Sequence, residues 1–134
     1  MAQEFDVDDF GRSFVPDQGR FRGVGLDAAG NEVLALGGYC SNSEQTTVSG
    51  SLFYRITEGN ITFNRGFGAC SFWNTANLAE VATHELGHTI GIGHSSEDNN
   101  AAPELKDATM YYRAHFDGRG AAVHADDIAA VRFI

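Results

Sequence analysis

The chain has 134 residues, of which 43% are hydrophobic, and its formal net charge is −9. This length supports one domain with one core, and the hydrophobic content argues against an intrinsically disordered chain. The acidic balance argues against nucleic acid or an anionic membrane as a partner. Because the sequence also lacks an apolar run of about 18 residues, we expect no membrane span. The predicted organisation is one globular, monomeric domain over residues 1–134.

Residues 1–31 carry the weakest structural signals. Asp6, Asp8 and Asp17 are spaced partly like the ligands of a calcium loop, but Phe10 stands where an oxygen ligand is needed. Calcium is therefore carried forward only as a hypothetical second cofactor.

Two strand-forming regions follow. The apolar run at residues 33–36 ends at Gly37-Gly38 and predicts a short strand, followed by a polar loop over residues 39–45. Residues 47–57 and 60–64 are rich in β-branched and aromatic residues and are separated by Glu58-Gly59, so we expect a hairpin with its turn there.

The two cysteines, Cys40 and Cys70, indicate whether the protein is found in an oxidising or a reducing compartment. A disulfide between them would close a loop of about thirty residues and stabilise the fold by about 3 kcal/mol, whereas two buried free thiols are the alternative. Neither cysteine has CxxC or metal-site spacing, so we favour the disulfide and an extracellular or secreted location. The opening residues Met1–Phe5 lack the features of a signal peptide.

A helix is predicted next. Asn77 and Glu80 have the spacing of a capping box, which predicts a helix start near residue 77 or 78. Apolar residues then recur at helical spacing, and we expect them to form its buried face: Leu78, Val81, Ala82 and Leu86.

This helix runs into the stretch that carries the chemistry. His84 and His88 are four residues apart, so both imidazoles can reach one metal ion, while Glu85 between them can hold a water and act as a general base. Gly91 can end the helix in the left-handed conformation, and the chain then returns to bring His94 as a third ligand. Three histidines leave one position of a tetrahedral zinc open, which is typical of a catalytic site.

The remaining residues predict a polar loop and a closing helix. The loop spans residues 95–107, and Ala108-Thr109-Met110-Tyr111-Tyr112 follows it. Residues 123–134 predict a helix in which Asp126 and Asp127 occupy the first turn, where the helix dipole favours acidic groups.

The motif of residues 84–95 resembles the metzincin metallopeptidases, and Ser95 after the third histidine resembles the matrixin branch, which includes matrix metalloproteinases and bacterial relatives. The resemblance covers residues 32–134. It implies an α+β, zincin-like catalytic domain with a twisted mixed sheet, a catalytic helix and a C-terminal helix, here shortened at its N-terminus. It also implies that residues 33–36 form the sheet edge above the cleft.

The same resemblance assigns roles to residues near the C-terminus. Met110 is the methionine of the Met-turn beneath the three histidines, and an aspartate of the pair Asp126 and Asp127 helps anchor that turn. Tyr112 stands where matrixins commonly have proline and where other metzincins have a tyrosine. It is therefore either a further zinc ligand or transition-state donor, or a wall of the specificity pocket.

The sequence thus predicts a zinc-dependent endopeptidase that hydrolyses extended protein substrates, with Glu85 as general base and His84, His88 and His94 as ligands. The alternatives are a non-catalytic, zinc-stabilised binding module and a truncated, inactive domain. Retention of Glu85 favours the enzyme, because a purely structural zinc has no use for a general base.

Overall fold

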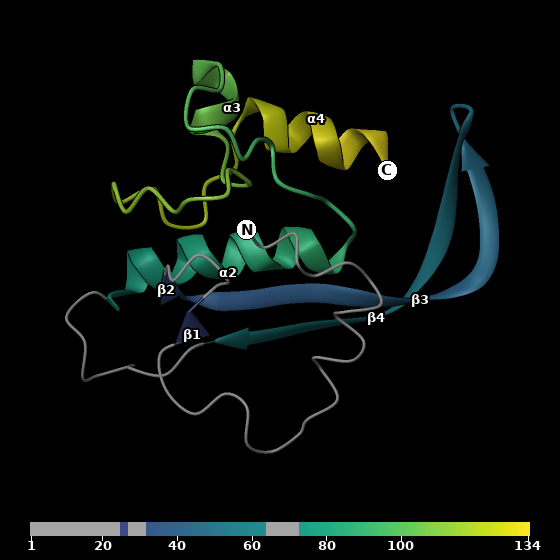
Figure 1. Cartoon of the computed structure of the whole chain (residues 1–134), viewed down its shortest axis with the longest axis horizontal. Helices are drawn as coiled ribbons and strands as arrows, with labels where there is room; N and C mark the ends of the chain where they lie inside the picture. Colours follow the sequence, from purple (N-terminus) through teal and green to yellow (C-terminus); the bar gives the residue numbers. More distant parts are fainter. Residues whose placement is uncertain (1–24, 27–31, 64–72) are drawn as a thin grey trace.

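A computed structural model describes residues 25–26, 32–63 and 73–134 of the chain. Two short strands, β1 (Gly25–Leu26) and β2 (Glu32–Val33), precede a long hairpin of β3 (Ala35–Val48) and β4 (Ser51–Phe63). Three helices follow: α2 (Thr75–Thr89), α3 (Pro103–Asp107) and α4 (Ala125–Phe133). Helix α2 lies along the hairpin, and α3 and α4 lie beyond it (Figure 1). No helix in the described part of the chain is long and apolar enough to cross a membrane.

The predicted α+β class is confirmed, but the strand pairing differs from the predicted mixed sheet. Among the described residues β1 pairs with β2 and β3 pairs with β4, and both pairs are antiparallel. The hypothetical calcium ligands before residue 25 lie outside the described residues.

The turn of the hairpin lies at Ser49-Gly50, so the predicted turn at Glu58-Gly59 and the predicted loop over residues 39–45 were wrong. Ser49 and Gly50 both have positive φ, 49° and 84°, which is the requirement of a tight two-residue hairpin turn. Gly59 instead lies within β4, where a Cβ atom would come 2.7 Å from the Cβ of Thr89. The glycine is therefore explained by its close approach to α2 and not by a turn.

The hairpin changes character near its middle. Regular pairing from Ala35↔Phe63 to Cys40↔Glu58 gives way to an irregular stretch between Ser41 and Gln45. Extra residues in one strand bend a hairpin locally, and the far part of this one bends toward the side of α4, where the rings of Phe53 and Phe133 lie 6.0 Å apart between centroids (Figure 1). We call residues 41–57 the distal arm. Most of its residues are exposed.

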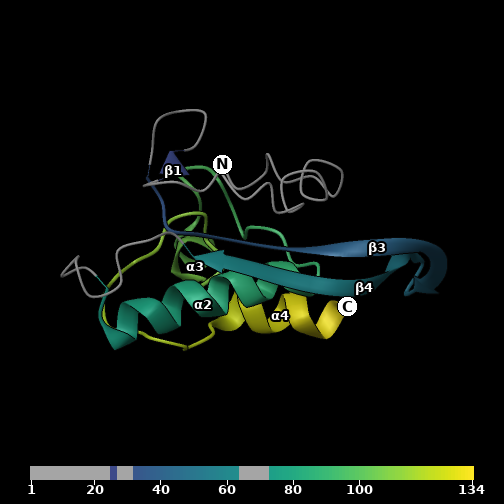
Figure 2. The same ribbon diagram turned by 90° about the horizontal axis from the view of Figure 1, so that it is seen from below.

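Helix α2 begins at Thr75, earlier than predicted, because the cap is Asn74 and not Asn77. The Asn74 side chain accepts a hydrogen bond from the Asn77 backbone N–H at 2.9 Å. Val81 is buried as expected, whereas Leu86 is 55% exposed and does not belong to the buried face. Figure 2 shows α2 running beneath the strands, so only part of its circumference meets the hairpin.

The C-terminal part closes the fold around α2. The predicted loop over residues 95–107 contains the short helix α3, which begins with Pro103 at its first turn. The predicted closing helix is confirmed as α4. Most of the buried apolar side chains in the described residues belong to α2 or to the segment that follows it: Val81, Ile92, Ala108, Met110 and Tyr111.

Candidate metal centre

The three histidines predicted as ligands lie together. The Nε2 atom of His84 is 3.1 Å from that of His88 and 3.2 Å from that of His94. Among the described residues this is the group of His, Cys, Asp and Glu side chains that could hold a metal ion, and Glu85 is not in it. Two nitrogens bound to one tetrahedral zinc at 2.0–2.1 Å would lie about 3.4 Å apart. The observed spacing fits that geometry closely.

The third histidine reaches the site because of how α2 ends. Gly91 has φ of 90°, its N–H donates to the His88 carbonyl at 3.1 Å, and the Ile92 N–H donates to the Gly87 carbonyl at 3.0 Å. This pair of bonds is the Schellman motif, in which a glycine in the left-handed conformation reverses the chain. The predicted role of Gly91 is therefore confirmed, and His94 follows directly from it.

The outer nitrogens of the histidines explain why the inner ones point at one another. The Nδ1 atoms of His84 and His88 lie 2.8 Å from the carbonyl oxygens of Thr109 and Ile92. A carbonyl only accepts, so each Nδ1 carries the proton and each Nε2 keeps its lone pair. These lone pairs converge, an arrangement that a shared cation stabilises.

Burial keeps these imidazoles neutral. Burial and, next, the neighbouring His88 lower the pKa of His84 to about 3, and the same two causes lower the pKa of His94 to about 3. Burial also lowers the pKa of His88. Neutral imidazole is the form that binds a metal, so the site is ready to bind a cation at neutral pH.

Glu97 is a contributor that the sequence analysis missed. Its Oε1 atom accepts a hydrogen bond from Nδ1 of His94 at 3.1 Å. Glu97 thus orients the ring of His94, as the carbonyls of Thr109 and Ile92 orient those of His84 and His88. Carboxylates in this position orient a ligating histidine and raise its basicity. The available signal was a carboxylate three residues after His94.

Glu85 is buried beside the histidines. Burial raises its pKa to about 7, and the backbone N–H of Gly37 in β3 partly opposes that rise. The backbones are in close contact here, because a Cβ atom on Gly37 would come 2.8 Å from Cα of Glu85. The strand predicted as the edge above the cleft therefore meets α2 at Glu85.

The segment Ala108–Tyr111 supports the site from the other side. A Cβ atom on Gly87 would come 2.8 Å from Cε of Met110, so this glycine makes room for the methionine. The backbone N–H groups of Thr109 and Met110 both donate to the Asp127 carboxylate at 2.9 Å. The expectation that an aspartate of α4 anchors this turn is confirmed for Asp127.

A sequence model of the family described as Matrixin matches residues 17–134. The chain belongs to the matrixin family. It carries the histidine triad of these zinc metallopeptidases. The family match begins before residue 32, where the resemblance was expected to start. Searches of curated proteins and of solved structures found no match.

The predicted roles of Tyr112 and of the two cysteines stay predictions for this matrixin. The Tyr112 hydroxyl is 2.6 Å from Oδ1 of Asn99, so its role at the metal stays a prediction. Cys40 is a half-buried cysteine within β3, where it pairs with Glu58 across the hairpin. Its predicted disulfide partner Cys70 lies outside the described residues, so the disulfide stays a prediction.

Proposed function

We propose that this matrixin is a zinc-dependent endopeptidase that cuts extended protein substrates. The observation that carries the proposal is the convergence of three neutral imidazoles whose outer nitrogens are all fixed by hydrogen bonds. His84, His88 and His94 would hold the zinc. When bound in such a site, zinc polarises a carbonyl and lowers the pKa of a coordinated water to about 7.

Glu85 supplies the proton transfers. A carboxyl group whose pKa lies near 7 can accept a proton from the attacking water and deliver it to the leaving amine. The N–H of Gly37 holds the carboxylate in place while this occurs. Burial of Glu85 also favours catalysis over a purely structural zinc, because burial raises its pKa into the range that suits a general base.

Strand β3 suits an extended substrate. In the described part of the chain it pairs with β4 along one edge, and its first residues lie against Glu85. A substrate strand added to the other edge would place its backbone near the histidines. Protein substrates follow from the family, and so does the extracellular location that we propose.

The test is cleavage of an unfolded protein by the zinc-loaded chain, run beside Glu85→Ala and Glu104→Ala. Glu104 is an exposed carboxylate on α3 and serves as the matched control. Loss of a general base lowers kcat by about 10²- to 10⁴-fold, so Glu85→Ala should bind zinc and lose activity while the control keeps both. If the wild type binds zinc and cuts nothing, the chain is a zinc-stabilised binding module or an inactive domain.

A further inference from the structure

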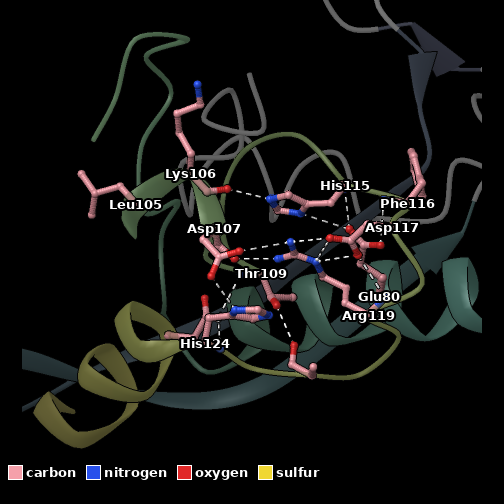
Figure 3. A network of polar contacts seen from close by, with 12 residues as sticks. Glu80, Leu105, Lys106, Asp107, Thr109, His115, Phe116, Asp117, Arg119 and His124 are labelled. Atoms are coloured by element: carbon pink, nitrogen blue, oxygen red, sulfur yellow. Dashed lines mark hydrogen bonds and ion pairs between the residues drawn. The ribbon is translucent and has the colours of Figure 1, made fainter. Parts of the chain in front are cut away.

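Glu80 is a buried carboxylate that the proposed mechanism does not use. It lies on α2 one turn before His84, and only 2% of its side chain is exposed. Its oxygens accept hydrogen bonds from the backbone N–H groups of His115 and Phe116, and Oε1 also lies 3.2 Å from Nδ1 of His115 (Figure 3). All of these contacts therefore join Glu80 to one two-residue stretch.

These contacts hold that stretch firmly. A buried carboxylate costs free energy unless charge-assisted hydrogen bonds compensate it. The other ring nitrogen of His115 lies 2.6 Å from the Lys106 carbonyl, so the ring links α2, residue 115 and the end of α3. Phe116 has φ of 54°, a left-handed conformation that persists in a bulky residue only where surrounding contacts impose it. The bond from its N–H to Glu80 is such a contact.

The same segment is fixed at its other end by the metal centre. The Thr109 carbonyl meets His84 and Met110 packs on Gly87, so residues 111–114 span two attachment points on one helix. Strand β3 approaches this helix at Glu85, whereas the segment approaches it at His84 and Glu80. The segment therefore runs beside α2 from the turn of the helix that carries His84 to the turn that carries Glu80, next to the metal centre.

We propose that Glu80 is a positioning residue that fixes residues 111–116 as a substrate-facing wall and thereby sets which side chains beside the cut bond are accepted. The inference rests on the proposed peptidase function. It assigns Glu80 no contact with substrate or metal, because its action passes through the backbone of residues 115 and 116.

The test compares Glu80→Gln with Asp117→Asn as the matched control. Asp117 is a carboxylate in the same loop, its side chain is 52% exposed, and it forms an ion pair with Arg119. The substrates are synthetic peptides based on a site that the wild type cuts, varied at the two residues flanking the bond. For Glu80→Gln we expect unchanged zinc content and an approximately tenfold change in relative kcat/KM among these peptides, mainly through KM. The control should keep the wild-type ranking.

A second variant covers the case in which Glu80→Gln does not fold. His115→Ala removes the ring contacts but leaves both backbone bonds to Glu80, so a smaller change of preference in the same direction is expected. Wild-type ranking and KM in a folded, zinc-loaded Glu80→Gln, or in His115→Ala if the first variant is unfolded, would overturn the inference. Failure of the wild type to cut any substrate would instead overturn the proposed function.

Discussion

The distal arm and the metal centre are built from different kinds of contact, although β3 joins them. Around the metal centre the polar groups are buried and paired, as with Glu80, Glu85 and Asp127. In the distal arm the ion pair between Arg55 and Glu44 has side chains that are 66% and 60% exposed. Buried polar groups are costly to disturb, whereas exposed pairs contribute little. We therefore expect substitutions to have large effects around the metal centre and small effects in the distal arm.

The largest effect should appear when the metal is removed and the pH is lowered. His84 and His94 have a pKa of about 3 when folded and 6.5 when unfolded, so the unfolded chain alone gains their protons below pH 6.5. Glu85 has the opposite effect. Its pKa is about 7 in the folded protein and 4.5 in the unfolded chain, so its contribution to the free energy of unfolding falls as the pH rises between these values. Two histidines outweigh one carboxyl, so the free energy of unfolding should fall by about 1–3 kcal/mol from pH 6.5 to 4.5.

Urea unfolding of the chelated protein at the two pH values measures this change. The variant His84→Asn/His94→Asn should have a weaker pH dependence than the wild type, whatever the other carboxylates contribute. Equal dependence in the two proteins would show that the buried histidines do not govern acid stability.

Gly37→Ala should have the next largest effect. The new Cβ atom would meet the backbone of Glu85, so β3 or α2 must shift, at a cost of about 1–3 kcal/mol and with loss of peptidase activity. Gly93→Ala is the control, because a Cβ atom there meets nothing within 4 Å. Thermal unfolding and peptide cleavage are the measurements, and similar losses in both variants would refute the contact as the cause.

Glu97→Ala should weaken zinc binding by about 10- to 100-fold, because His94 loses the acceptor that orients it. Competition with a chelator gives the affinity, and Glu44→Ala in the distal arm is the matched carboxylate control. Unchanged zinc affinity in Glu97→Ala would mean that the backbone alone holds His94.

Arg55→Ala should have the smallest effect. Loss of its exposed ion pair should change the free energy of unfolding by less than about 0.5 kcal/mol and leave cleavage unaltered. Cleavage rates of short peptides and of a whole protein should be compared. If Arg55→Ala cut the whole protein more slowly but short peptides at the normal rate, the distal arm would contact large substrates. The expected difference between the two regions would then be wrong.

The metal centre could be predicted in more detail than the sheet because its information is local. The spacing of His84, His88, Gly91 and His94 fixes a helix, its end and the return of the chain. The hairpin turn was misplaced because Gly59 resembles a turn glycine by sequence, whereas contact with α2 accounts for it.

Hydrogen bonds between residues distant in sequence also could not be predicted. Glu80 had the spacing of a capping residue, yet it bonds to residues 35 and 36 positions away. Only the folded chain brings such groups together. The support of Asp127 for the Met-turn was expected solely because the family resemblance implied it.

Asp127 also has a consequence for the order in which the protein is made. It follows Met110 by 17 residues and holds the turn whose Thr109 carbonyl orients His84. Synthesis runs from the N-terminus, so all three histidines leave the ribosome before Asp127 does. A nascent chain can thus carry every zinc ligand while the support for His84 is still missing. Orientation of His84 by the Thr109 carbonyl therefore gains its support from Asp127 only once α4 has been made.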